Sequence, residues 1–155
     1  MQLNQIFKRE FLNDRLSARN KDEALEEMIK TVIAGGLTLD TSSILDILKQ
    51  RESLGSTGIG DGVAIPHGKT SNIHDIIVAF GRSKDGIAYD ALDGKPVHLF
   101  FMVLAPENSA GQHLKILAKI SKMLKDEQFR KKLLDASSND DLYRIILEQE
   151  NICIV

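Results

Sequence analysis

The chain has 155 residues, of which 43% are hydrophobic and 27% charged, and this composition predicts one globular domain over residues 1–155 with a sizeable core. The formal net charge is −2 with acids and bases mixed along the chain, so no nucleic-acid partner is expected. No apolar run approaches the roughly 20 residues that span a bilayer, and residues 1–10 carry charges where a signal peptide needs its apolar stretch. The single cysteine, Cys153, excludes an internal disulfide and a multi-cysteine metal site. We therefore expect a cytoplasmic protein that inserts into no membrane.

The first third of the chain predicts mainly helix. Residues 1–18 have the least regular pattern, and residues 11–18 within them are compatible with an edge strand. A helix is predicted over 20–34, with Asn20 as its N-cap and Gly35 after its last turn. A second helix is predicted over 41–52. The residues expected on its buried face are Ile44, Leu45 and Leu48.

The middle of the chain predicts two strands. Residues 75–82 and 97–104 are strongly apolar, and the turn signal Gly-Lys-Pro at 94–96 precedes the second run. Strands that are apolar on both faces are covered on both faces. We therefore expect helices on both sides of the sheet.

The last third predicts three helices. They cover residues 109–125, residues 127–136, and a final segment that begins at Ser138 or Asn139 and runs through Gln149. The residues expected on the buried stripe of the first of these helices are Leu114, Leu117, Ile120, Met123 and Leu124. The order of elements predicts a layered α/β or α+β domain.

The most informative segment is residues 55–69, Gly-Ser-Thr-Gly-Ile-Gly-Asp-Gly-Val-Ala-Ile-Pro-His-Gly-Lys. Glycines at this density mark backbone that turns tightly or lies close to another group. Pro66 restricts the approach of His67, whose imidazole titrates near neutral pH. A surface histidine in a loop is the alternative, but the glycine-rich lead-in favours a reactive group.

The glycine spacing predicts no bound nucleotide. Lys69 does not stand in a Gly-x-x-x-x-Gly-Lys-Ser/Thr motif, and the Gly-x-Gly-x-Gly at 58–62 lacks the dinucleotide fingerprint. Backbone amides of this segment remain candidates for cradling a phosphate.

Other candidate site residues lie outside this segment. His113 is in the first turns of a helix that follows a buried strand, where α/β domains bind ligands. Arg51 lies at the end of the second helix. It is either a cation favoured by the helix dipole or a guanidinium that faces a bound phosphate. His74 is expected in a solvated loop and His98 in a packed strand. No His-Glu-x-x-His spacing supports zinc.

Taken together, these motifs resemble the enzyme IIA domains of the fructose–mannitol class in the bacterial phosphoenolpyruvate-dependent sugar phosphotransferase system, including its nitrogen-regulatory branch. The resemblance covers nearly the whole chain. The segments that carry it are Arg51-Glu52, residues 55–69, residues 88–97, residues 101–106 and residues 113–118. It implies an α/β layered sandwich with a mixed central sheet flanked by helices on both faces.

The resemblance also implies site roles and partners. His67 stands where the family has its phosphorylated histidine, His113 where it has a second active-site histidine, and Arg51 where it has its active-site arginine. The phosphate donor would be the histidine phosphocarrier protein or its nitrogen-branch relative. The acceptor would be a cysteine of a separate enzyme IIB in sugar uptake, which we favour, or the chain would instead control regulatory target proteins. A non-catalytic binding module is a more distant alternative.

We further expect backbone amides to surround the phosphoryl oxygens, with no cofactor and no metal. The residues expected to form this cradle are Ser56, Thr57, Gly58, Gly60 and Gly62.

Overall fold

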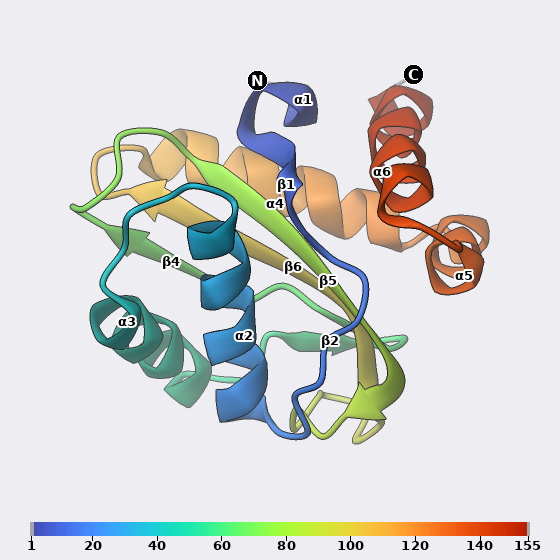
Figure 1. Cartoon of the computed structure of the whole chain (residues 1–155), viewed down its shortest axis with the longest axis horizontal. Coiled ribbons are helices and arrows are strands. Elements are labelled where there is room, and N and C mark those ends of the chain that lie inside the picture. Colours follow the sequence, from blue (N-terminus) through green and yellow to red (C-terminus); the bar gives the residue numbers. More distant parts are fainter. Residues whose placement is uncertain (1, 155) are drawn as a thin grey trace.

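The structure, a computed structural model that describes residues 2–154, is built on a six-stranded sheet (Figure 1). Its strands are β1 (Phe7–Asn13), β2 (Gly58–Gly60), β3 (Val63–Ala64), β4 (His67–Thr70), β5 (Ile77–Ile87) and β6 (Val97–Pro106). They are ordered β1-β5-β6-β3-β2, and β4 also pairs with β6. The β5–β6 and β2–β3 pairs are antiparallel, whereas the β1–β5, β3–β6 and β4–β6 pairs are parallel. The expected mixed central sheet is confirmed.

Helices cover both faces of this sheet, as expected from its apolar central strands (Figure 1). They are α1 (Leu3–Ile6), α2 (Lys21–Ala34), α3 (Thr41–Ser53), α4 (Ala110–Leu124), α5 (Glu127–Asp135) and α6 (Asn139–Ile154). α2 and α3 pack on one face, and α4, α5 and α6 on the other. None of the helices within residues 2–154 is long and apolar enough to cross a membrane.

The alternation of side chains along β5 and β6 divides the core into two layers. Phe80 and Phe101 pack with α4, α5 and α6, while their sequence neighbours Ala79 and Phe100 pack with α2 and α3. All four side chains are fully buried. The continuous apolar runs of the two strands are therefore explained by a layer of helices on each side.

Local signals predicted the start of α2 and the cap of α6 correctly. The Asn20 side chain accepts a hydrogen bond from Glu23 N at 2.9 Å, which caps α2. The Ser138 hydroxyl accepts one from Asp141 N at 3.1 Å at the start of α6. This last helix extends five residues beyond the predicted end at Gln149.

The predicted buried stripe of α4 was wrong at one position. Leu114 is 65% exposed, and Ile116 is buried in its place. Ile116, Ile120 and Met123 lie at spacings of four and three and share one helical face. Leu114 is two residues from Ile116, or about 200° around the helix, and so points to the opposite side. On α3, Leu45 is only half-buried.

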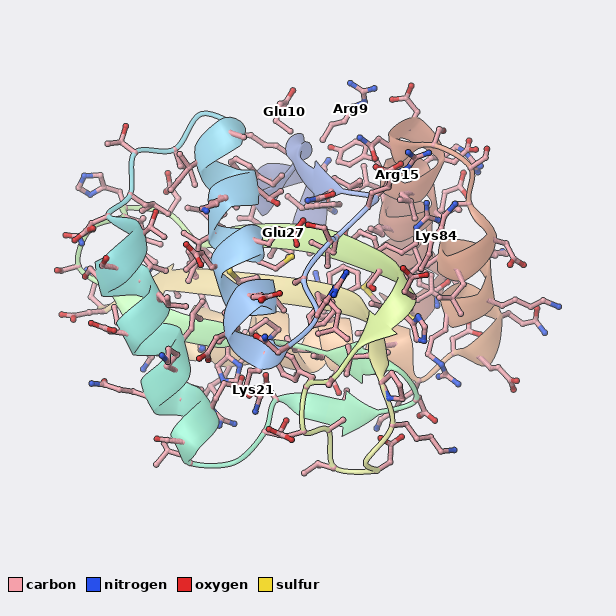
Figure 2. The ribbon with its side chains drawn as sticks, turned by 60° about the horizontal axis from the view of Figure 1, so that its bottom comes forward. Arg9, Glu10, Arg15, Lys21, Glu27 and Lys84 are labelled. Atoms are coloured by element: carbon pink, nitrogen blue, oxygen red, sulfur yellow. The ribbon has the colours of Figure 1, made fainter. Side chains whose placement is uncertain are left out.

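The predicted edge strand over 11–18 was wrong in its bounds, although β1 does lie at the sheet edge. The amides of Ser17 and Ala18 donate to the Glu27 carboxylate on α2 at 2.8–3.0 Å rather than to a neighbouring strand. Figure 2 labels Glu27 on α2. The connection from β1 to α2 therefore follows the helix, which residue pattern alone does not reveal.

β5 runs to Ile87, five residues beyond the predicted end at residue 82, and Arg82 is the charged residue buried within it. Its side chain is fully buried, and its guanidinium donates to the carbonyl oxygens of Leu133 and Ala136 at 2.9 and 2.6 Å and to Asp14 O at 3.3 Å. The first two carbonyls lie at the C-terminal end of α5, where the helix dipole favours a cation. A charged residue within the sheet is thus stabilised by backbone acceptors.

Candidate active site

Three elements bring the predicted site residues together. His67 is the first residue of β4 and pairs with Val103 of β6. Arg51 lies in the last turn of α3, and His113 lies in the first turns of α4. The Nε of Arg51 is 3.2 Å from Nε2 of His67, and the imidazole centroids of His67 and His113 are 5.5 Å apart. Two histidines and an arginine, distant in sequence, thus form one cluster.

Hydrogen bonds define the tautomer of His67. Its Nδ1 lies 2.8 Å from the carbonyl oxygen of Ile65, which can only accept, so Nδ1 carries the proton. At the other ring nitrogen, Nε2 accepts from the Nε–H of Arg51. The imidazole is therefore neutral, with the lone pair of Nε2 directed into the cluster. Nε2 is the nitrogen that can act as a nucleophile.

The electrostatic environment keeps His67 neutral. Burial lowers the pKa of His67 below its ordinary value, while its hydrogen bond to Ile65 opposes that change. The Arg51 charge lowers this pKa further, and the Glu52 carboxylate acts in the opposite direction. The lone pair is consequently available at neutral pH.

His113 is almost completely buried, with 4% of its surface exposed. Burial lowers the pKa of His113 to about 4, with smaller contributions in the same direction from electrostatic interactions with His67 and Lys69. Within residues 2–154, its buried Nδ1 has no hydrogen-bond partner. Buried polar atoms are nearly always paired, so this nitrogen is a candidate contact for a bound group.

The depressed pKa of His113 predicts a loss of stability in mild acid. Unfolded histidine binds a proton near pH 6.5, whereas His113 in the folded chain does so only near pH 4. The unfolded state therefore binds more protons as the pH falls below 6.5, and the free energy of unfolding decreases. Between pH 7.5 and 5 we expect wild type to lose about 1–2 kcal/mol more than His113→Leu in urea titrations. An equal loss in both proteins would contradict this assignment.

Gly68 allows α3 to lie close enough to place Arg51. A Cβ at Gly68 would lie 2.6 Å from Cγ2 of Ile47, which is much shorter than a real carbon contact. Ile47 is on α3, one turn before Arg51. The glycine next to His67 therefore serves the packing of α3 on β4, and this packing brings the guanidinium to the imidazole.

The expected phosphate cradle divides into two parts. The amide of Thr57 donates to the Glu52 carboxylate at 3.1 Å, and the amide of Gly58 donates to the Ser56 hydroxyl at 3.0 Å, so both amides have partners within the chain. Gly60 and Gly62 belong to the β2–β3 hairpin and have positive φ angles of 98° and 76°.

The hairpin glycines lie away from the imidazole along β6. Gly62 O accepts from Leu99 N, whereas His67 pairs with Val103. Four residues of strand separate these two positions, a distance of ~13 Å. The structure does not bring Gly60 and Gly62 to His67.

The remaining histidines lie where the sequence predicted. His74 is exposed, and Nδ1 of His98 lies 2.9 Å from Ser83 O on the neighbouring strand. In the described part of the chain, no group of three or more His, Cys, Asp or Glu side chains is placed to hold a metal ion.

Sequence reasoning missed Glu52 and its partner Tyr89. Glu52 continues the Ile44–Leu48 stripe of α3 at a spacing of four, which puts a carboxylate on the buried face. That spacing was the available signal. Tyr89 donates from its hydroxyl to Glu52 at 3.2 Å, and burial raises the pKa of Tyr89 well above its ordinary value.

Comparison with known proteins identifies the family. The family model described as phosphoenolpyruvate-dependent sugar phosphotransferase system, EIIA 2, matches residues 5–149. The chain belongs to this family. It is therefore a component of the phosphotransferase system, and its mixed α/β fold is that of the EIIA proteins.

Relatives of this EIIA chain carry names from two branches. It is 37% identical to the fructose-specific EIIABC component of Bacillus subtilis, with 97% of the chain matched but only 24% of that longer protein. It is 39% identical to the fructose-specific EIIA component of Haloferax volcanii, with 83% of each protein matched. It is also 37% identical to the nitrogen regulatory protein of Escherichia coli, with 97% of this chain and 92% of that protein matched.

A solved structure confirms the fold. The nitrogen regulatory protein IIA-Ntr of Neisseria meningitidis superposes with a TM-score of 0.86 at 33% identity, covering 93% of this chain and 98% of that one. IIA mannitol of E. coli has a TM-score of 0.75 at 20% identity, covering 90% and 97% of the two chains, a likeness of fold alone.

Proposed function

We propose that this EIIA chain is a phosphoryl carrier that accepts a phosphoryl group on Nε2 of His67 and passes it to another protein. The observation that carries this proposal is the pair of hydrogen bonds on the imidazole. The Ile65 carbonyl holds the proton on Nδ1, and Arg51 contacts the free lone pair of Nε2. A neutral, oriented imidazole beside a guanidinium is suited to accept a phosphoryl group.

In the proposed step, the lone pair of Nε2 attacks the phosphorus of a phosphohistidine on the donor protein. A P–Nε2 bond forms, and the P–N bond of the donor breaks with its electron pair returning to the donor imidazole. Nδ1 of His67 keeps its proton, and the Ile65 carbonyl stabilises the positive charge that develops on the ring. Transferring the group onward reverses this sequence at His67, with a nucleophile of the acceptor as the attacking group.

Arg51 and His113 would stabilise the charge on the transferred group. The Nε–H of Arg51, which donates to the lone pair, would turn to donate to a phosphoryl oxygen once the lone pair is used. The imidazole of His113, whose centroid lies 5.5 Å from that of His67, would approach the same group. Stabilisation of this kind needs positioned donors rather than a bound metal.

Exposed apolar side chains next to the site support a protein as the reaction partner. Leu54 follows the turn of Arg51 and is 83% exposed, and Leu114 is adjacent to His113 and 65% exposed. Large exposed apolar side chains close to a reactive group favour docking of a macromolecule. We propose that the donor is the histidine phosphocarrier protein.

For the acceptor we propose a cysteine of a separate enzyme IIB in sugar uptake, as the fructose-specific relatives suggest. IIA mannitol of E. coli, with the same fold at 21% identity, has been solved in complex with phosphorylated enzyme IIB. A regulatory role is the second candidate, because the match to nitrogen regulatory proteins extends over nearly their whole length. Phosphoryl transfer to a purified fructose-specific IIB favours the first role, and its absence favours the second.

The test of the carrier function is to identify the phosphorylated nitrogen. The purified chain is incubated with phosphoenolpyruvate, enzyme I and the phosphocarrier protein in EDTA and examined by ¹⁵N and ³¹P NMR. We expect one acid-labile phosphoryl group on Nε2 of His67, with Nδ1 still protonated. Phosphorylation on Nδ1, an acid-stable adduct, or loss of transfer in EDTA would contradict the proposed chemistry.

A further inference from the structure

Glu52 is a buried carboxylate that none of the proposed transfer steps uses. Its side chain is 4% exposed, and it follows Arg51 directly on α3. Oε1 forms an ion pair with Nζ of Lys21 at 3.1 Å and accepts a hydrogen bond from the amide of Thr57 at 3.1 Å. Oε2 accepts hydrogen bonds from the hydroxyl of Tyr89 at 3.2 Å and from the hydroxyl of Thr57. A buried charge with this many donors requires an explanation, since burying it is costly unless every lone pair is satisfied.

The partners of Glu52 come from different parts of the fold. Lys21 is the first residue of α2 (Figure 2), Thr57 lies between α3 and β2, and Tyr89 follows β5. Nζ of Lys21 also lies 4.9 Å from the centroid of the Tyr89 ring, so the network is closed on itself. Glu52 therefore joins the end of α3 to three other segments of the fold.

Residues 55–57, which Glu52 contacts through Thr57, are also held by Arg51. The guanidinium donates from one terminal nitrogen to Gly55 O at 2.9 Å and from Nε to His67. Gly55 is thus held by Arg51, and Thr57, two residues later, is held by Glu52. The path of residues 55–57 and the direction of the guanidinium are consequently set together.

We propose that Glu52 is a positioning residue for phosphoryl transfer, which holds the last turn of α3 and residues 55–57 so that Arg51 is directed at Nε2 of His67. This inference rests on the proposed carrier function. All partners of the carboxylate are donors, so only the ionised form accepts from all of them. Glutamine has the same size but no charge to pair with Lys21, and its amide nitrogen requires the hydroxyls of Thr57 and Tyr89 to accept where they now donate.

The experiment compares Glu52→Gln with Glu150→Gln. Glu150 is a carboxylate of similar burial on α6. It pairs with Nζ of Lys119 at 2.7 Å and accepts a hydrogen bond from the amide of Leu3 at 2.8 Å. It packs with the helices on the opposite face of the sheet from α3. The two substitutions remove a charge of similar burial and similar pairing, but only the first lies beside Arg51.

We expect Glu52→Gln to lower kcat for phosphoryl transfer by about 10- to 100-fold with KM for the phosphorylated donor changed by less than about twofold. Glu150→Gln should leave both constants close to wild type, even if its melting temperature falls as far. Tyr89→Phe, which removes one hydrogen-bond donor to Glu52, should lower kcat by about three- to tenfold. It is the variant that tests the proposal if Glu52→Gln does not fold. An unchanged kcat in folded Glu52→Gln, or an equal loss in Glu150→Gln, would overturn the proposal.

A second readout does not depend on transfer. The charged or titratable groups acting on His67 are Arg51 and Glu52 from α3, with His113 packed beside it from α4. Because the Glu52 charge opposes that of Arg51, Glu52→Gln should shift the NMR titration of His67 to lower pH, and Glu150→Gln should not. If wild type accepts no phosphoryl group but this shift occurs, the proposed carrier function fails while the electrostatic effect of Glu52 on His67 stands. If wild type is active and Glu52→Gln has the same His67 titration and the same transfer rate as wild type, the positioning role of Glu52 fails.

Discussion

We expect the His67→Ala variant to accept no detectable phosphoryl group from the phosphorylated donor, a loss of at least about 10³-fold. The reason is that Nε2 of His67 is the oriented lone pair of the cluster, held between the Ile65 carbonyl and the Arg51 guanidinium. The measurement is incorporation of label from phosphoenolpyruvate, followed over seconds to hours. The imidazole is half-buried, so the variant should remain folded, with a stability change within about 1–2 kcal/mol.

His74→Ala is the matched control for this result. It removes an imidazole from an exposed loop and should be labelled as fast as wild type. His113 is the alternative acceptor, because its ring lies 5.5 Å from that of His67. Acid-labile label on His113 in the His67→Ala variant, formed at a rate near that of wild type, would contradict His67 as the nucleophile.

The second large effect is expected from Arg51. Arg51→Ala should lower kcat by about 10²- to 10³-fold, because it removes the donor that faces the phosphoryl group as charge is transferred. Arg51→Lys keeps the charge but not the fork that joins Nε2 of His67 to Gly55 O, and should recover only part of the activity. Single-turnover rates with saturating phosphorylated donor provide the measurement.

The His67 titration gives an independent check on Arg51. The Arg51 charge lowers the pKa of His67, so Arg51→Ala should raise that pKa, opposite in sign to the effect of Glu52→Gln. Arg144→Ala is the control, since Arg144 is an exposed cation on α6 that pairs with Asp141 and Glu148. Full activity in Arg51→Ala, or an equal loss in Arg144→Ala, would contradict the role assigned to Arg51.

Residue pattern predicted the helices well and the strands partly. The bounds of α2 follow from Asn20 and the apolar spacing of its own turns, which are local properties. β1 was misplaced because the amides of residues 17 and 18 bind Glu27, a contact that depends on how α2 packs. β2 and β3 were not predicted, since each is too short to show a pattern and is stabilised by its neighbours in the sheet.

The candidate site was predicted in composition but not in geometry. The order of residues around His67 identified the imidazole, and the resemblance added His113 and Arg51. Neither indicated that Gly60 and Gly62 lie along β6 from the imidazole, because turn residues and ligand-facing residues can both be glycine.

The amino-acid sequence by itself determined the helices from α2 to α6 and the two central strands, and it singled out His67 as the candidate reactive histidine, because caps, periodicity and motif order act over a few residues. Only the tertiary structure decided which nitrogen of His67 is free, which side chains meet it and what holds them. Arg51 reaches Nε2 because Gly68 admits α3 against β4, and the Glu52 carboxylate accepts from donors of three separate segments. These relations join residues far apart in the chain, and they exist only once the sheet and its two helical layers have packed.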